Sequence, residues 1–156
     1  SEMCIRDRGK TNSLDVLGGD NLGNICEKFK PCPEVYELCK NGKLYTICRE
    51  EIYTEISNCV KDLKSWVESA GWDIEVTPEL EGYVESELTF KRSDVEELMK
   101  VYGEVLCRLI KEEGLSLDDA LEEAHYSDEV SDCVNNIVAK RLNETITKYF
   151  EIRATI

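Results

Sequence analysis

This chain of 156 residues has only one histidine, no glutamine and no long apolar run, and these features limit the kinds of site and the cellular locations that it can have. With His125 alone, a metal site built on two histidines is excluded. No Gly-x-Ser-x-Gly motif marks the nucleophile of a hydrolase. No apolar run reaches the roughly 18 residues of a membrane-spanning helix, and no secretory signal opens the chain. We therefore expect a soluble protein located in the cytoplasm.

Basic residues are scarce: 19 lysines and arginines stand against 33 aspartates and glutamates, for a net charge of −14. Binding to nucleic acid or to anionic membranes depends on clustered Lys and Arg, so neither partner is expected. A basic partner protein or a metal cation is compatible with this charge. The lack of glutamine beside abundant Glu and Lys matches the composition of hyperthermophile proteins.

The N-terminal segment is expected not to be native. Ser1–Arg8 resembles the conceptual translation of the transposase mosaic-end adapter used in sequencing libraries. The resemblance implies that the natural chain was cut upstream of Gly9 and that the sequence is a fragment of a longer protein. Residues 9–32 include a stretch rich in Gly, Asn and Asp and are predicted to be a loop or the remnant of a truncated N-terminal region. Residues 33–156 are predicted to form a single α+β domain.

The stretch Arg49–Ala70 is predicted to be a long amphipathic helix that organises the fold. Its apolar residues recur at spacings of three and four, with polar residues opposite, which is typical of a helix lying on a sheet. The Gly71–Trp72 pair is expected to end it. Upstream, Asn41–Gly42 separates two alternating segments between Val35 and Arg49 and predicts a β-hairpin. The alternative is a short helix that starts at Pro33 and ends at the same glycine.

Three further segments alternate apolar and polar residues and are predicted to be strands: Asp73–Val76, Val84–Phe90 and Thr145–Thr155. Apolar stripes of helical period, each preceded by a capping serine, predict three helices starting near Ser93, Ser116 and Ser127. The predicted fold class is therefore α+β, with a small antiparallel or mixed sheet packed against one long helix and a three-helix segment.

Cysteines are the first candidates for a site, and four of them fall within a short window without a Cys-x-x-Cys pair: Cys26, Cys32, Cys39 and Cys48. In the predicted hairpin, Cys39 and Cys48 would lie about 13 Å apart at ~3.4 Å per residue, too far to share one zinc ion. Cys26, Cys32 and Cys48 remain candidate zinc ligands, without an evident fourth ligand. The alternatives are a disulfide such as Cys32–Cys48, or buried free thiols.

Carboxylates are the second candidates. Asp94 with Glu97, and Glu129 with Asp132, each place two acids on one face of a predicted helix, and two such helices packed together could hold Mg²⁺. The stretch Glu129–Val134 resembles the second acidic box of the all-α nucleotide pyrophosphatases, which implies a magnesium-dependent enzyme. The first box of that family is not matched, and the predicted strands depart from its all-α fold. The alternative is that these acids only complement helix dipoles, by roughly 0.3–1 kcal/mol each.

No catalytic signature emerges from the sequence. The predicted function is therefore an acidic intracellular protein-interaction or regulatory domain with a protein partner, and not an enzyme. The first alternative is a divalent-metal-dependent enzyme of the nucleotide pyrophosphatase type, with Mg²⁺ on the acidic helices. The second is a module that binds zinc through cysteines. His125, at the end of a predicted helix, is expected to have a surface or capping role.

Overall fold

The computed structural model describes residues 25–155, and every regular element in that range is an α-helix. The predicted α+β class is therefore wrong, since no strand occurs among these residues. The adapter-like segment 1–8, residues 9–24 of the predicted N-terminal loop, and Ile156 lie outside the described residues. No helix of the described part is long and apolar enough to cross a bilayer.

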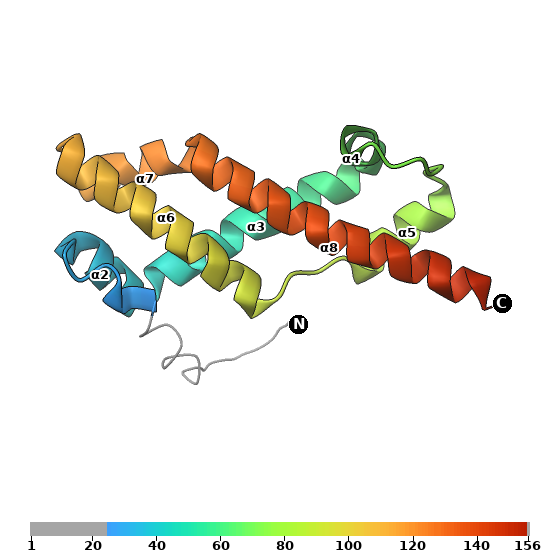
Figure 1. The fold of residues 1–156 in the computed structure, drawn as a ribbon, viewed down its shortest axis with the longest axis horizontal. Helices are drawn as coiled ribbons and strands as arrows, with labels where there is room; N and C mark the ends of the chain where they lie inside the picture. Colours follow the sequence, from blue (N-terminus) through green and yellow to red (C-terminus); the bar gives the residue numbers. More distant parts are fainter. Residues whose placement is uncertain (1–24, 156) are drawn as a thin grey trace.

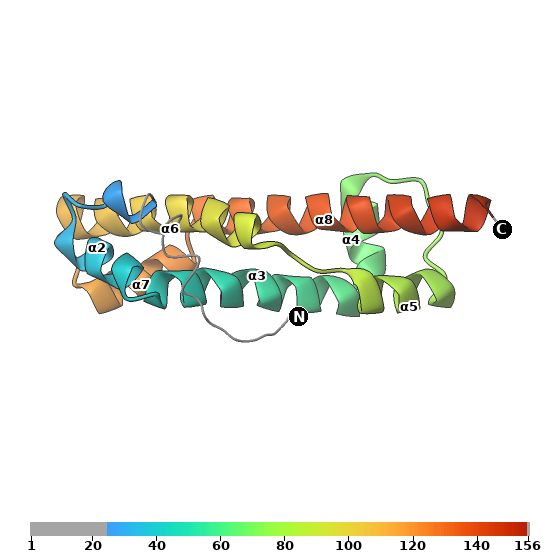
Figure 2. The same ribbon diagram turned by 90° about the horizontal axis from the view of Figure 1, so that it is seen from below.

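The three longest helices build the core: α3 (Lys43–Lys61), α6 (Arg92–Glu112) and α8 (Asp128–Ala154). α6 and α8 lie in one layer and α3 packs against both from the other layer (Figures 1 and 2). Shorter helices occupy the two ends of the molecule: α2 (Pro33–Lys40), α4 (Leu63–Ala70), α5 (Pro78–Glu87) and α7 (Leu117–His125). α2 and α7 lie at one end, whereas α4 and α5 lie at the other end with the last turns of α8 (Figure 1).

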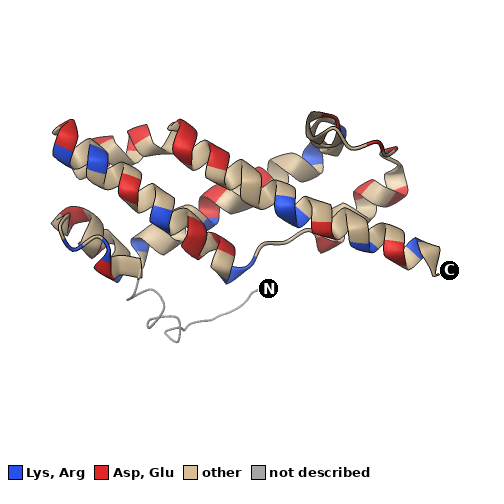
Figure 3. Cartoon of the chain, viewed as in Figure 1, with Lys and Arg blue, Asp and Glu red and all other residues tan. Residues whose placement is uncertain are grey.

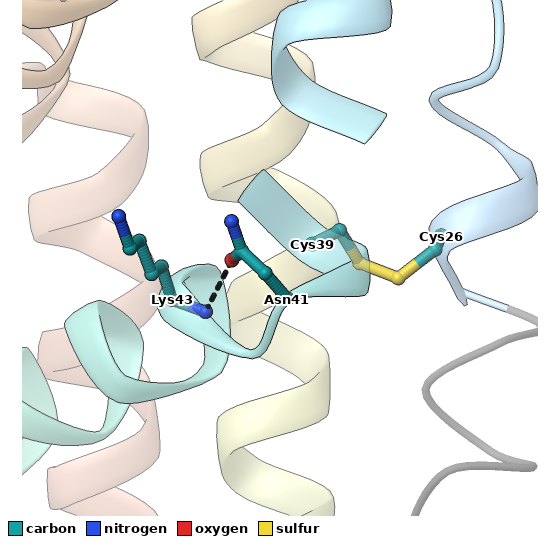
Figure 4. The surroundings of a disulfide bond; sticks show 4 residues. All are labelled: Cys26, Cys39, Asn41 and Lys43. Atoms are coloured by element: carbon teal, nitrogen blue, oxygen red, sulfur yellow. Dashed lines mark hydrogen bonds between the residues drawn. A yellow bond between two sulfur atoms is a disulfide. The ribbon is translucent and has the colours of Figure 1, made fainter. Parts of the chain in front are cut away.

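The predicted hairpin at Asn41–Gly42 is wrong, and the alternative helix from Pro33 is correct. Pro33 takes the first position of α2, where its missing N–H has no helical partner to lose. Gly42 has φ 84° and separates α2 from α3, and Asn41 Oδ1 accepts a hydrogen bond from the Lys43 N–H at 3.0 Å (Figure 4). An Asn-Gly pair signals a left-handed backbone position, which ends a helix as readily as it turns a hairpin.

The predicted strand Val84–Phe90 is also wrong, because most of it belongs to α5. Thr77 caps this helix, and its side-chain oxygen accepts a hydrogen bond from the Leu80 N–H at 3.1 Å. Leu80, Val84 and Leu88 are buried at a spacing of four. A spacing of four places residues on one face of a strand and also on one face of a helix. The apolar and polar alternation between Val84 and Phe90 therefore could not distinguish the two structures.

The other two predicted strands are wrong for different reasons. Asp73–Val76 has no regular secondary structure. Its side chains alternate between partly buried and exposed, but no strand within residues 25–155 lies beside it. Thr145–Thr155 continues α8, whose buried face runs on through Leu142, Ile146 and Tyr149 at spacings of four and three. The β-branched residues here disfavour a helix by only about half a kcal/mol each, less than packing of that face supplies.

The predicted helices are present with adjusted ends. Ser116 and Ser127 cap α7 and α8 as predicted, each accepting a backbone N–H from three residues further on. The predicted cap at Ser93 is wrong: the carboxylate of Asp94 instead accepts the N–H of Lys91 at 2.8 Å, ahead of the first turn of α6.

The predicted organising helix Arg49–Ala70 is divided between α3 and α4, which meet at Asp62. Gly71, with φ 75°, ends α4, so the predicted break at this glycine is confirmed. The apolar stripe packs against other helices instead of a sheet, and Trp66 is only partly buried.

The core extends upstream of residue 33, the predicted start of the domain. Ile25, Cys26, Phe29 and Cys32 are all buried. The ring of Phe29 fills the space beside Gly103 of α6, where a Cβ atom would overlap it. Gly103 therefore provides the room that lets residues 25–32 lie against α6.

Candidate functional site

Three of the four cysteines in the window form two disulfides at one end of the molecule, and the second disulfide takes its other cysteine from α6. Cys26 is bonded to Cys39 of α2 (Figure 4), and Cys32 is bonded to Cys107 of α6, with Cα–Cα distances of 5.6 and 5.9 Å. The zinc candidates Cys26, Cys32 and Cys48 are not brought together, because the first two belong to different disulfides and Cys48 is a buried free thiol. No group of three metal-ligating side chains occurs within residues 25–155.

The free thiols of the described residues are Cys48, Cys59 and Cys133. Burial raises the pKa of Cys48 well above its ordinary value, the pKa of Cys59 to about 12 and the pKa of Cys133 to about 11. The thiolate is the nucleophilic form, so at neutral pH these thiols are almost entirely unreactive. They pack as small apolar side chains and are not candidates for a catalytic nucleophile.

Asp94, the first of the candidate magnesium ligands, is buried at the start of α6 and paired with Arg141 of α8. Arg141 Nε donates to Oδ2 at 2.7 Å and Nη2 donates to Oδ1 at 2.8 Å. Burial raises the pKa of Asp94, but hydrogen bonds from Arg141 and from the Lys91 N–H outweigh it, and the net effect is a lowered pKa. A carboxylate whose two oxygens both bind a guanidinium has little capacity left for Mg²⁺.

The two predicted acid pairs lie far apart along the packed helices α6 and α8. The helices run antiparallel, because Asp94 binds Arg141 in the middle of α8, whereas Glu129 at the start of α8 binds the C-terminal part of α6. Glu129 precedes Arg141 by 12 positions, or roughly 18 Å at ~1.5 Å per residue. Ligands of one Mg²⁺ lie about 2 Å from it, so Asp94 cannot share an ion with Glu129, and no three of the acids within residues 25–155 gather closely enough to hold one.

Acidic residues gather at the end of α6, on α7 and at the start of α8 (Figure 3). No lysine or arginine occurs from residue 112 to residue 132. We call this surface the acidic end, and its exposed carboxylates are Glu112, Glu113, Asp118, Asp119, Glu122, Glu123, Asp128, Glu129 and Asp132. Arg108, which donates to Glu129 Oε2 at 2.6 Å, marks its border on α6.

An aromatic side chain lies in the middle of the acidic end. Tyr126, between α7 and α8, is 77% exposed. Its ring packs edge-on against His125, with ring centroids 4.7 Å apart. His125 Nδ1 in turn bonds the Glu51 carboxylate of α3, so the imidazole is fixed beneath the phenol. The predicted surface position of His125 is confirmed. No local sequence pattern marks Tyr126.

A shallow pocket lies at the opposite end, between the irregular segment 73–77 and the last turns of α8. It has a volume of about 420 Å³, and Ile74, Tyr149 and Phe150 contribute its apolar lining. Arg153 Nη1 donates to Glu79 Oε2 at 3.0 Å and to the Tyr149 hydroxyl at 2.9 Å. The cation of this pocket is already paired, which makes it a poorer recognition surface than the acidic end.

Comparison of the chain with protein-family models, with curated proteins and with solved structures gives no match. The resemblance of Glu129–Val134 to an acidic box of the nucleotide pyrophosphatases therefore has no support from these comparisons, and the predicted acid pairs do not form a common metal site within residues 25–155. Function must therefore be inferred from the surface itself.

Proposed function

We propose that this chain is a protein-interaction domain and that its acidic end binds a basic segment of a partner protein. The observation that carries the proposal is the set of nine exposed carboxylates between Glu112 and Asp132, a stretch that contains no lysine or arginine. Such a surface attracts cationic partners and speeds their association, because its potential adds to that of a chain with net charge −14.

Tyr126 adds an apolar and hydrogen-bonding contact to the electrostatic attraction of the acidic end. Interfaces are enriched in tyrosine, whose ring adds apolar area and whose hydroxyl adds a hydrogen bond. A guanidinium or ammonium group over an exposed ring gains roughly 0.5–1 kcal/mol. With its ring fixed against His125 at 4.7 Å, Tyr126 loses little conformational freedom when a partner binds. The partner segment is therefore expected to carry arginine or lysine next to an apolar residue.

The proposal includes a cytoplasmic location in a hyperthermophile. Two disulfides are unusual in the cytosol of mesophiles but persist inside hyperthermophile cells. The composition without glutamine agrees with such a source. Nucleic acid and membranes stay outside the proposed set of partners, because their recognition requires clusters of basic residues.

A fluorescent arginine- and lysine-rich peptide of about 15 residues tests the acidic end by anisotropy. Neutralising α7 with Asp118→Asn, Asp119→Asn, Glu122→Gln and Glu123→Gln should weaken binding about tenfold or more at low ionic strength. The matched control removes the same charge from the opposite end, at four exposed acids: Glu75→Gln, Glu81→Gln, Glu85→Gln and Glu87→Gln. This control should weaken peptide binding about twofold at most, because salt screens the charges of the opposite end from a peptide bound at the acidic end.

Equal weakening by the two sets of substitutions would show that only net charge matters and would contradict the proposal. Tyr126→Ala gives an uncharged test, because it leaves every carboxylate in place. It should weaken the peptide about threefold, whereas Phe150→Ala, at an exposed ring on the C-terminal part of α8, should have no effect.

A further inference from the structure

We propose that the Cys32–Cys107 disulfide is a redox-reactive site that accepts a small anionic thiol, while Cys26–Cys39 is a structural bond. The two disulfides differ first in access. Cys26 and Cys39 are 0% and 1% exposed, whereas Cys107 is partly exposed. Thiol–disulfide exchange requires the attacking sulfur to reach one sulfur of the bond, so the buried disulfide is protected and the other is not.

A surface pocket leads to the accessible disulfide. Both Cys32 and Cys107 line it, together with Phe29, and its volume is about 360 Å³. That space admits a small peptide thiol. Cys32 is only 4% exposed, so the attacking thiol meets Cys107 first.

The charges around this pocket admit an anionic reagent, because they lack the acidic excess of the chain as a whole. The lining includes three cations, Lys28, Arg108 and Lys111, against two carboxylates, Glu104 and Glu112. Arg108 is paired with Glu129 at 2.6 Å, so the two lysines and the two carboxylates of the lining balance, and Lys28 and Lys111 are the cations left to contact a reagent. Nearby cations bind the carboxylates of the reagent and raise the fraction of its sulfur present as thiolate.

The exchange proceeds in two steps. The thiolate of the reagent attacks Cys107 Sγ, the bond to Cys32 breaks, and Cys32 leaves as a thiolate that takes a proton from water. A second reagent thiolate attacks the reagent sulfur of this mixed disulfide and releases Cys107, which is likewise protonated. The protein disulfide is thereby reduced to two thiols, and two reagent thiols are oxidised to one reagent disulfide.

Reduction at this site uncouples one part of the fold from another. Cys26–Cys39 is internal to residues 25–40, whereas Cys32–Cys107 is the bond that links this segment to α6. After reduction, residues 25–40 are held to α6 by packing alone, which includes the Phe29 ring beside Gly103 and contacts of α2. Residues 25–32 can then leave α6, whereas α2 still packs on α3.

The experiment exposes the folded, oxidised protein to reduced glutathione, traps thiols with iodoacetamide and quantifies each cysteine by peptide mass spectrometry. Cys32 and Cys107 should be labelled at least about tenfold faster than Cys26 and Cys39, with the glutathione adduct on Cys107. Labelling of Cys26 and Cys39 at the same rate or faster, or an adduct confined to another cysteine, would overturn the proposal.

Charge variants distinguish guided access from simple exposure. Lys28→Gln with Lys111→Gln should slow the reaction with glutathione about threefold or more. It should slow the reaction with 2-mercaptoethanol, whose only charge is that of its thiolate, to a smaller extent. Glu104→Gln with Glu112→Gln, a matched pair on the same pocket, should accelerate the glutathione reaction. Equal slowing of both reagents by the lysine variants would overturn the assignment to an anionic thiol.

Discussion

The two ends of the molecule are held together by different means. At one end, residues 25–32 bury only a few apolar side chains, and two disulfides tie the segment to α2 and α6. At the other end, α5 packs on α8 without a covalent link, through the rings of Tyr83 and Tyr149 at 5.2 Å. Where the chain leaves α5 and enters α6, Asp94 and Arg141 form a buried ion pair. A segment too short to hold itself by packing is cross-linked, whereas a longer helix relies on aromatic and ionic contacts.

Breaking the cross-link at the first end should have the largest effect. Replacing Cys32 and Cys107 by serine opens a loop of 75 residues and should reduce the free energy of unfolding by about 4–5 kcal/mol on the chain-entropy model. Replacing Cys26 and Cys39 opens a loop of 13 residues and should lose about 3 kcal/mol. Guanidinium unfolding of the oxidised proteins measures both. A larger loss from the shorter loop would show that loop length does not set the stabilisation.

Breaking the ionic contact should be nearly as costly. Asp94→Asn leaves Arg141 buried with only Glu144 as a charged partner and should reduce the free energy of unfolding by about 3–5 kcal/mol. The double variant Asp94→Leu with Arg141→Met removes both charges and should lose clearly less. If the double variant were the less stable, the pair would be stabilising in its own right.

The same pair predicts a pH dependence. The pKa of Asp94 is lowered in the folded protein, so its contribution is complete above the unfolded value of about 3.9. That contribution is lost as the pH falls through the lower folded pKa. The stability difference between the natural protein and Asp94→Asn should therefore narrow below about pH 4. A constant difference from pH 7 to pH 2 in urea titrations would contradict this assignment.

A smaller change in the free energy of unfolding is expected at Gly103, and its sign should depend on Phe29. Gly103→Ala places a methyl group against the Phe29 ring and should cost about 1–2 kcal/mol. In a Phe29→Ala background the space is empty, and alanine should stabilise α6 by up to about 1 kcal/mol through its helix propensity. Thermal unfolding of the four proteins of this cycle checks the sign. The same effect of alanine in both backgrounds would mean that Phe29 does not occupy this space.

The smallest effect is expected at the exposed ion pair. Glu129→Gln removes the partner of Arg108, but both side chains are about half exposed, at 48% and 45%. Water and salt screen such a pair, so the melting temperature should stay unchanged within error. A loss comparable to that of Asp94→Asn would show that burial does not distinguish the two pairs.

The features that could be predicted from the sequence are those set by interactions between residues close together in the chain. Ser116 and Ser127 were identified as caps because a cap bonds an N–H only three residues away. Asn41–Gly42 correctly indicated a positive φ, but that requirement is common to hairpins and helix ends. The spacing of four between Val84 and Leu88 fits both periods, so only the caps of α5 could have decided between them.

The site depended on pairings that no local pattern contains. Cys107 lies 75 positions from Cys32, and a disulfide partner cannot be chosen from spacing alone. Arg141 is separated from Asp94 by 47 positions, so the ion pair between them could not be predicted from a local sequence pattern. The exposed carboxylates of the acidic end were countable in the sequence, but their gathering on one surface required the antiparallel packing of α6 and α8.

The two-residue joint between α2 and α3 determines where this chain tolerates changes in length. One residue inserted between Gly42 and Cys48 would rotate everything upstream by about 100° about the axis of α3. Cys32 would then be carried away from Cys107. An insertion in the irregular segment 73–77 would not rotate one helix against another in this way, because α4 and α5 on either side are separate short helices and not parts of one continuous helix. Natural or engineered insertions and deletions are therefore expected to accumulate at that segment and to be excluded from the joint.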